Sequence, residues 1–246
     1  MPDEHYENAR LAEIYDLDSG WSIDRDFYLA LAGNSPEYIL DLGCGTGLLC
    51  NAYASKGHHV TGADPSGQML EVAKRKPFGK HIEWVQSTAQ SFKSSKRFDL
   101  IIITGHAFQV LLDETDVLAA FSTMRGHLKT HGKIVFESRN PNIDWAKNWS
   151  YEMEIDLPRG KVLESRKFVS MSEGRMKFDL LYEFPDEKLV SNSELKFLTR
   201  QRIEQLLNKS DLRVETVFGD WHGNPLDERT SEEMIFTVRK TSKCNC

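Results

Sequence analysis

Short hydrophobic runs alternate with amphipathic helical patterns through the first half of the chain. This alternation is typical of βαβ units, in which parallel strands form a sheet that helices cover. In the helical pattern from Val117 to Leu128, apolar side chains recur every three or four positions, so we expect them to form one stripe against the sheet. The runs that predict strands are Tyr38 to Leu42, His59 to Ala63, Ile82 to Gln86, Phe98 to Ile103 and Lys133 to Glu137.

Further along the chain the pattern changes to strict alternation of apolar and polar residues. Residues 151–157 and 176–184 alternate in this way, and a Ser172-Glu173-Gly174 turn signal precedes the second run. Such alternation predicts antiparallel strands with one solvated face. A helix is expected to start at Thr199 as its N-cap, and residues 212–218 and 233–239 predict the last two strands.

The chain shows no repeat, low-complexity tract or linker, so residues 1–246 are predicted to form a single domain. Residues 1–30 carry helix-like patterns rich in aromatic side chains, which predict an N-terminal helical cover. Residues 148–197 are predicted to be a β-rich insertion within the domain. The sequence leaves open whether this insertion caps an acceptor site or builds the contact of a homodimer.

A glycine-rich motif, Asp41-Leu42-Gly43-Cys44-Gly45-Thr46-Gly47, directly follows the first predicted strand. Glycines permit a tight turn and let a ligand approach the backbone, while the helix start that follows offers unpaired N–H groups. The spacing is G-x-G-x-G, and Leu48 stands where a dinucleotide-binding loop has its third glycine. Asp64 ends the second strand, where its carboxylate can accept hydrogen bonds from both hydroxyls of a ribose. The motif favours a nucleoside-containing ligand over an ordinary turn and helix cap.

With these residues the chain resembles the class I S-adenosylmethionine-dependent methyltransferases over most of its length. Residues 38–47 look like the family's first motif, and Gly62 to Met69 looks like the second. Phe98 to Ile102 is similar to the fourth strand, and Leu128 to Phe136 to the approach to the fifth. The resemblance is closest to the small-molecule branch with a β-rich cap. It implies an α/β, Rossmann-like, doubly wound sheet of seven strands in the order 3-2-1-4-5-7-6, with strand 7 antiparallel.

The resemblance also implies which residues bind the cofactor, S-adenosylmethionine. The glycine loop would hold its methionine part, Asp64 its ribose and Met69 one face of its adenine. The third motif departs from the family pattern, because Thr88 stands where many relatives have an aspartate for the adenine amino group; a hydroxyl or the Ala89 amide would then contact the adenine edge. The expected cofactor-binding residues are Asp41, Gly43, Cys44, Gly45, Gly47, Asp64, Pro65, Met69, Thr88, Ala89 and Thr104.

The methyl group of a sulfonium is already activated, so the protein mainly has to position the acceptor. A general base matters when the acceptor is a hydroxyl or a protonated amine. His106 follows the fourth strand at the reactive edge of the sheet and is the candidate base, with a structural role as the alternative. Tyr15 and Trp21 either close over the cofactor or pack on the sheet. The loop 219–224, with Trp221 and His222, is either a turn or part of the acceptor pocket.

Charge and composition limit the classes of partner that we expect for the protein. The formal net charge of −6 and the short basic clusters disfavour nucleic acid. Asn140-Pro141 follows the fifth strand and lacks the second proline and aromatic residue of nucleic-acid amino methyltransferases. No apolar stretch approaches a membrane span, and the N-terminus lacks the layout of a signal peptide, so we expect a cytoplasmic protein. Cys44, Cys50, Cys244 and Cys246 are expected to be thiols, and no ligand spacing indicates a metal.

The expected function is the transfer of a methyl group from S-adenosylmethionine to a nucleophilic atom of a small-molecule acceptor that the sequence does not identify. One alternative is a nicotinamide-dependent oxidoreductase, against which Leu48 counts. The other is a non-catalytic cofactor-binding protein on the same fold, which the lack of an acceptor motif leaves open.

Overall fold

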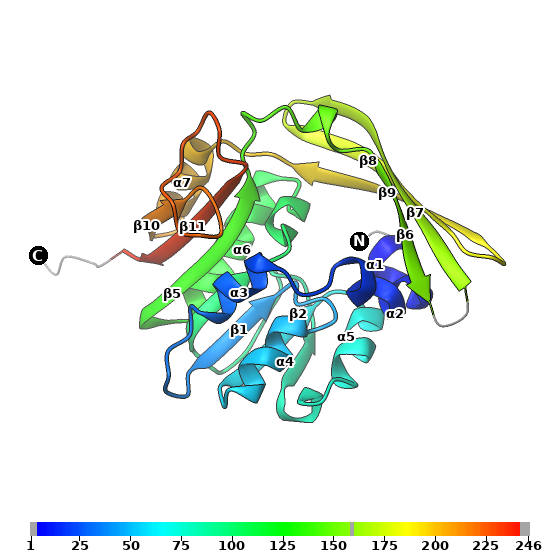
Figure 1. Cartoon of the computed structure of the whole chain (residues 1–246). Coiled ribbons are helices and arrows are strands. Elements are labelled where there is room, and N and C mark those ends of the chain that lie inside the picture. Colours follow the sequence, from blue (N-terminus) through cyan, green and yellow to red (C-terminus); the bar gives the residue numbers. More distant parts are fainter. Residues whose placement is uncertain (1–3, 158–159, 242–246) are drawn as a thin grey trace, which may run out of the picture.

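The computed structural model describes residues 4–157 and 160–241. Its larger sheet has seven strands in the order β3-β2-β1-β4-β5-β11-β10, and β11 runs antiparallel to both of its neighbours (Figure 1). The strand order and the antiparallel strand expected from the family resemblance are therefore confirmed. The strands are β1 (Tyr38–Leu42), β2 (His59–Asp64), β3 (Glu83–Gln86), β4 (Phe98–Ile103), β5 (Leu128–Arg139), β10 (Leu212–Phe218) and β11 (Glu233–Lys240).

Helices cover both faces of this sheet, because neighbouring residues of its central strands point to opposite sides. Ile39 of β1 belongs to the apolar cluster that contains Tyr53 of α4, whereas Leu40 belongs to the cluster that contains Phe121 of α6. The helices and short 3-10 turns around this sheet are α3 (Ile23–Leu29), α4 (Leu48–Ser55), α5 (Gly67–Lys74), η1 (Gly79–His81), η2 (Ala107–Val110), α6 (Glu114–His127) and α7 (Arg200–Lys209), while η3 (Trp145–Lys147) contacts β7 (Gly160–Ser172) of the second sheet.

The junction between α6 and β5 differs from the prediction. The expected stripe is buried at Val117, Phe121 and Met124, but Leu128 is the first residue of β5 and no longer part of the helix. Leu128 pairs with Phe98, which extends the predicted strand at its start, and the pairing of Arg139 with Glu233 of β11 extends it at its end. The long strand follows from having a partner on each side.

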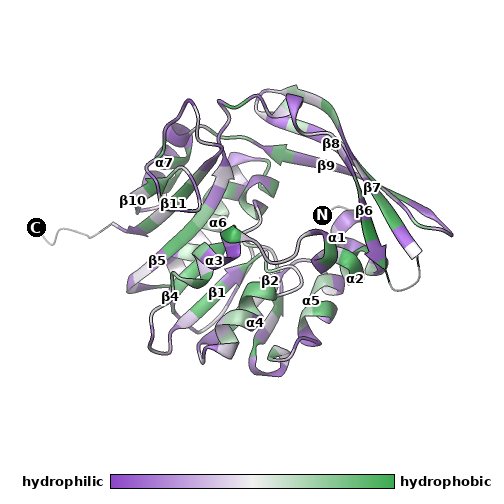
Figure 2. Ribbon diagram, in the orientation of Figure 1, coloured by the Kyte–Doolittle hydropathy of each residue, from purple (hydrophilic) through white to green (hydrophobic). Residues whose placement is uncertain are grey.

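An antiparallel sheet of four strands, in the order β6-β7-β8-β9, forms a second layer, here called the cap sheet. It arches over the N-terminal helices in Figure 1, and its strands change repeatedly between hydrophilic and hydrophobic colours in Figure 2. Glu173 and Gly174 both have positive φ, 49° and 69°, which suits the two-residue hairpin turn predicted there. The inserted antiparallel cap is thus confirmed. Its strands are β6 (Tyr151–Leu157), β7 (Gly160–Ser172), β8 (Arg175–Glu183) and β9 (Lys188–Lys196).

Two N-terminal helices, α1 (Glu4–Glu7) and α2 (Ala9–Asp18), lie between the cap sheet and α5 (Figure 1). Leu11 belongs to the apolar cluster of the cap sheet. The backbone N–H of His5 donates to Ser191 Oγ of β9 at 3.1 Å, and Ser66 Oγ donates to the Tyr6 carbonyl at 2.6 Å. The segment thereby joins the cap sheet to the larger sheet. Across residues 4–157 and 160–241, none of the helices has both the length and the apolar character needed to cross a bilayer.

Candidate cofactor and acceptor site

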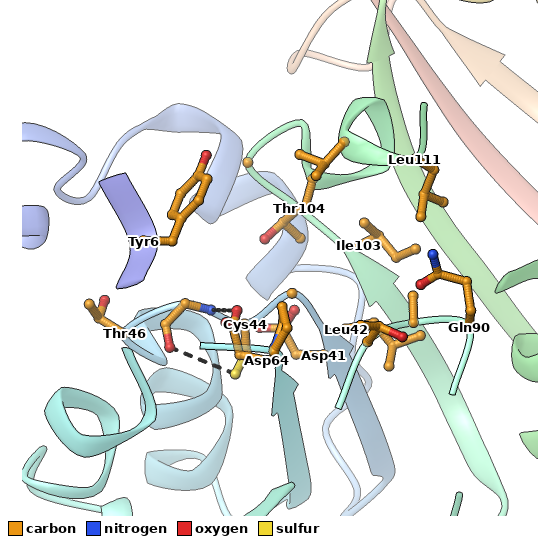
Figure 3. A pocket seen from close by; sticks show the side chains of 18 of the residues that line it. Tyr6, Asp41, Leu42, Cys44, Thr46, Asp64, Gln90, Ile103, Thr104 and Leu111 are labelled. Carbon is orange, nitrogen blue, oxygen red and sulfur yellow. Dashed lines mark hydrogen bonds between the residues drawn. The ribbon is translucent and has the colours of Figure 1, made fainter. Parts of the chain in front are cut away.

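A cavity of about 540 Å³ lies at the carboxyl ends of β1, β2 and β4, beneath the N-terminal helices and β9. This is the edge at which doubly wound sheets bind their ligands. Figure 3 shows Asp41 and Asp64 on one side of the cavity and Tyr6 and Thr104 across from them. The sequence-predicted residues that line it are Asp41, Gly43, Cys44, Gly45, Asp64, Pro65, Thr88, Ala89 and Thr104.

The glycine loop wraps over the end of β2. The N–H groups of Gly43 and Cys44 both donate to the Ala63 carbonyl, at 2.7 and 3.1 Å. Gly43 and Gly45 have φ of 75° and 53°, a left-handed conformation that favours glycine. The Tyr15 ring approaches the loop as well, since a Cβ added at Gly45 would lie 4.0 Å from its Cε1. The loop can therefore present bare backbone to a ligand.

Two residues expected at the cofactor lie outside the cavity lining. A Cβ at Gly47 would meet the Trp84 ring at 2.5 Å, so this glycine is required for packing as well as for its φ of 73°. Met69 is 1% exposed in α5, and its N–H donates to Ser66 Oγ, the N-cap of that helix. Their contacts with the cofactor stay predictions.

The Asp64 carboxylate is held by backbone donors at the cavity wall. Gly45 N–H donates to its Oδ2 and Ser66 N–H to its Oδ1, each at 2.8 Å. Burial raises the pKa of Asp64, while these two hydrogen bonds lower it. A carboxylate oxygen has a further lone pair after accepting one hydrogen bond, so both oxygens can still accept a ribose hydroxyl.

Asp41 supplies a buried carboxylate next to the loop. It is 1% exposed, its Oδ2 accepts a hydrogen bond from Cys50 Sγ at 3.5 Å, and its Oδ1 has no partner among the described residues. Burial raises the pKa of Asp41 to about 7. An unpartnered buried oxygen in a cavity wall calls for a donor, and the ammonium group of a methionine-type ligand would fit it.

Arg25 is a cavity residue that the sequence did not indicate. Its side chain is 16% exposed, and its guanidinium donates to the Ser19 carbonyl at 2.8 Å and to Ser22 Oγ at 3.0 Å. A guanidinium with donors in a fixed fork suits a carboxylate such as that of methionine. Arg25 reaches the site through the fold of the N-terminal helices, so no spacing within the chain could have revealed it.

The His106 ring lies beside Glu233. Its Nε2 is 3.0 and 2.9 Å from the two carboxylate oxygens, and its backbone N–H donates to Glu137 Oε1 at 2.6 Å. His106 is not among the residues that line the cavity, although its neighbours Gly105 and Ala107 are. Its role as a base stays a prediction.

Of the aromatic residues that the sequence singled out, some line the cavity and others lie outside its lining. Tyr15 lines the cavity, whereas Trp21 is 46% exposed and its Nε1–H donates to Asp26. The Trp221 ring packs against Phe27, with ring centroids 5.7 Å apart, and neither Trp221 nor His222 lines the cavity. The predicted thiols Cys244 and Cys246 lie outside the described residues.

Carboxylates also line the cavity on the side of α6 and β9. Asp113 forms an ion pair with Arg175, and Glu194 forms one with Lys177 at 2.9 Å. The Asp116 carboxylate, by contrast, has no hydrogen-bond or ion-pair partner within the part of the chain that the structure describes. This wall therefore favours a cationic group over an anionic one.

Comparisons with known proteins indicate a methyltransferase domain. Residues 39–132 match the family model of a methyltransferase domain. The chain is 21% identical over 203 residues to the cypemycin N-terminal methyltransferase of Streptomyces sp, covering 82% of this chain and 83% of that protein. It is 32% identical over 146 residues to a ubiquinone biosynthesis O-methyltransferase of Bradyrhizobium sp., covering 55% and 53%. The chain thus spans about half the length of this relative.

Solved structures extend the likeness to nearly the whole fold. The CcbJ methyltransferase from Streptomyces caelestis has a TM-score of 0.80 at 16% identity, covering 98% of this chain and 100% of that one. An S-adenosylmethionine-dependent methyltransferase from Clostridium acetobutylicum has a TM-score of 0.79 at 17% identity, covering 95% and 98%. At these identities the likeness concerns the fold.

The motifs, the strand order and the family match together define a methyltransferase. Residues 39–132 carry the methyltransferase domain, and the whole fold, with its antiparallel cap sheet, is similar to that of solved methyltransferases. The predicted family and enzyme class are confirmed, and the comparisons give no support to a nicotinamide-dependent oxidoreductase or a non-catalytic protein. S-adenosylmethionine is the cofactor of this family, and the loop, Asp41 and Asp64 fit its parts.

Proposed function

We propose that the chain transfers the methyl group of S-adenosylmethionine to an amine nitrogen of a small molecule bound beneath the cap sheet. The observation that carries this proposal is one continuous cavity. It joins the cofactor cradle at Asp41 and Asp64 to an acidic wall at Asp113 and Asp116. A nucleophile that enters from the cap side would therefore approach a methyl group held from the loop side.

Different residues at this end of the cavity would bind different groups of the cofactor. Asp41 would accept from the ammonium group, Arg25 would donate to the carboxylate and Asp64 would accept from the ribose hydroxyls. The Ala89 amide or the Thr88 hydroxyl, which is 2.9 Å from Ser91 Oγ, would contact the adenine edge. When bound, the sulfonium supplies an activated methyl group, and the protein contributes mainly position.

The acidic wall would bind and orient the acceptor. A protonated amine is attracted to carboxylates, and among the described residues no cation pairs with Asp116. The amine must lose a proton before its lone pair can attack, and a carboxylate or water at this wall can accept it. A strong base is not required, because an amine ionises much closer to neutral pH than an alcohol.

The names of similar proteins support nitrogen as the acceptor atom. CalS10 of Micromonospora echinaspora is an amino pentose methyltransferase, with a TM-score of 0.71 at 20% identity over 93% of this chain and 96% of that one. KedS8 of Streptoalloteichus sp is a sugar N-methyltransferase. The O-methyltransferase relatives match only about half of this chain. A dimer contact through the cap sheet and a cytoplasmic location stay predictions.

The test is calorimetric titration with S-adenosylhomocysteine and with reduced nicotinamide dinucleotide, followed by an assay of S-adenosylhomocysteine release with amines and matched alcohols. We expect binding of S-adenosylhomocysteine and turnover of amines. Tight nicotinamide binding without S-adenosylhomocysteine binding would overturn the methyltransferase assignment. Turnover of alcohols alone would overturn the nitrogen acceptor, and binding without any turnover would favour a non-catalytic protein.

A further inference from the structure

Arg166 lies on the inner face of β7 among aromatic rings. Its Cζ is 4.7 Å from the ring centroid of Tyr151, 5.3 Å from that of Trp149 and 5.7 Å from that of Phe178. Within residues 4–157 and 160–241, its guanidinium makes no hydrogen bond or ion pair, and its Nε is fully buried. Aromatic faces attract the cation, but they leave its N–H donors without acceptors. A charge withdrawn from water is normally paired, so Arg166 needs an explanation.

A second guanidinium reaches the same indole from the larger sheet. Arg139 is the last residue of β5, and its Cζ lies 5.0 Å from the Trp149 ring centroid. Its Nη1 donates to the neutral side-chain amide of Gln109 at 3.1 Å. Burial and the nearby charge of Arg166 lower the pKa of Arg139, while the Glu233 and Glu137 carboxylates raise it. Two cations from the two layers of the protein therefore converge on one tryptophan, and within the described residues neither forms an ion pair with a carboxylate.

Trp149 adds an unused donor between them. The residue is 4% exposed, and its Nε1–H has no acceptor among the described residues. Glu164, two residues before Arg166, does not fill this gap, because its Oε1 accepts from the Tyr151 hydroxyl at 2.6 Å. Burial and the Asp18 carboxylate raise the pKa of Glu164, while the Tyr151 hydrogen bond and the charge of Arg166 lower it. Glu164 Oε2 is also buried without a hydrogen-bond partner, so among the described residues the cluster leaves two donors, Trp149 Nε1–H and Arg166 Nε–H, and one acceptor unsatisfied.

Arg139, Arg166 and Trp149 are not among the residues that line the cavity, and aromatic rings connect the cap side of the cavity to the cap sheet. The Tyr6 ring, which lines the cavity, has its centroid 4.5 Å from that of His5, and the His5 ring stacks on Tyr182 of the cap sheet at 5.7 Å. Arg139 interacts electrostatically with Tyr6 and stands at the carboxyl end of β5, beside β4. A molecule that extends from the cavity past Tyr6 toward the cap sheet would approach these donors.

We propose that Arg139, Arg166 and the Trp149 indole N–H form a subsite for an anionic group of the methyl acceptor, a carboxylate or a phosphate. This inference rests on the proposed function, since it describes the far end of the molecule whose amine is methylated. Guanidinium forks hold planar and tetrahedral oxyanions by paired hydrogen bonds. The acceptor is then a molecule with an amine at one end, beside Asp116, and an anion at the other.

The probes are acetate and inorganic phosphate, added at constant ionic strength to the full chain saturated with S-adenosylhomocysteine. Fluorine NMR of protein labelled with 5-fluorotryptophan reports the Trp149 resonance, which the Trp149→Phe variant assigns. We expect a saturable shift of that resonance with at least one anion, and the anion that binds more tightly identifies the carboxylate or the phosphate. Arg166→Gln should weaken this binding at least about tenfold, as expected for a charge-assisted bond to a buried partner.

Lys167→Gln is the matched control, because Lys167 is the next residue of β7, is exposed and loses the same charge. It should leave the affinity of the anion unchanged. If Arg166→Gln does not fold, Arg139→Lys and Arg166→Lys, which keep the charge but lose the fork, should weaken binding severalfold. The proposal is overturned if neither anion gives a saturable shift or if the arginine variants behave like Lys167→Gln. Loss of S-adenosylhomocysteine binding in the unmodified chain would instead count against the proposed function.

Discussion

The backbone N–H of Gly45 donates to Oδ2 of Asp64 at 2.8 Å. This hydrogen bond joins the glycine loop after β1 to the carboxylate at the end of β2, so the two family motifs form one wall of the cavity. Because the donor is a backbone group, the contact depends on the path of the loop and not on a particular side chain. The carboxylate is thereby oriented before any ligand arrives, which reduces the entropy lost on binding.

Asp64→Ala should weaken the binding of S-adenosylhomocysteine at least about tenfold, because charged hydrogen bonds to two hydroxyls would be lost together. Calorimetry measures the dissociation constant. Glu71→Gln is the control, since Glu71 is exposed on α5 and outside the cavity lining. Equal affinities of the Asp64 and Glu71 variants would show that Asp64 does not contact the ligand.

The raised pKa of Asp41 predicts that its carboxyl group releases a proton when the cofactor binds. Its pKa is raised to about 7 from an ordinary 3.8, so at pH 6 the free protein holds the neutral form, whereas an ammonium partner favours the ionised form. Calorimetry at pH 6 in buffers of different ionisation enthalpy should show the release of up to one proton per S-adenosylhomocysteine. The Asp41→Asn variant should show none. Buffer-independent enthalpies in the unmodified chain would contradict this prediction.

The same shift has a consequence for stability. An acid whose pKa is higher in the folded than in the unfolded chain opposes folding once it ionises, so its effect on stability appears as pH rises from about 4 to about 7. Without cofactor, the free energy of unfolding of the natural chain should therefore fall across this window relative to that of Asp41→Asn. Urea unfolding measures this free energy at each pH. A constant difference between the two proteins from pH 4 to pH 7 would contradict the prediction.

Gly47→Ala should destabilise the fold by about 1–3 kcal/mol, because its φ of 73° is strained for alanine and its Cβ would meet the Trp84 ring. Urea unfolding measures the loss. Trp84→Leu in the same chain should recover part of it by removing the clash while the backbone strain persists. Fully additive losses in the double variant would show that the two residues do not interact.

His106→Gln distinguishes a catalytic base from a structural residue. A general base contributes about 10²- to 10⁴-fold to the rate. Because the His106 ring pairs with Glu233 and lies outside the cavity lining, we expect kcat to change less than about tenfold and stability to fall by about 1–3 kcal/mol. A hundredfold fall in kcat with unchanged stability would instead identify His106 as the base.

Asp116→Asn should raise KM for amine acceptors about three- to tenfold, since an attractive carboxylate becomes neutral, and leave the affinity for S-adenosylhomocysteine unchanged. Asp144→Asn, on an exposed ion pair with Lys147, is the control. Initial rates at saturating cofactor measure both variants. An unchanged KM would show that the amine does not bind beside Asp116.

The strands that could be predicted are those whose pattern is local. β1 and β4 have the predicted bounds, because both strands are mostly apolar and buried on both faces. The pattern did not predict β7, since Glu164 and Arg166 take inward positions that apolar residues normally occupy. β9 was obscured similarly, by the buried serines Ser191 and Ser193.

The site residues that could be predicted are likewise those that belong to local motifs. Asp41, the glycine loop and Asp64 belong to contiguous motifs, so the sequence alone indicates them. Arg25 and Tyr6 reach the cavity only because the N-terminal helices fold back beneath the cap sheet. The convergence of Arg139 and Arg166 on Trp149 requires the cap sheet to be placed over β5, which no local pattern encodes.

The central claim is that one cavity holds S-adenosylmethionine at Asp41 and Asp64 and turns its methyl group toward the cap sheet. A crystal structure with S-adenosylhomocysteine tests it most directly. We predict that the ribose hydroxyls lie within hydrogen-bond distance of Asp64 and the ammonium group within that distance of Asp41 Oδ1, with the sulfur facing Tyr6 and Thr104. A nucleoside bound elsewhere, or a ribose without a contact to Asp64, would contradict it.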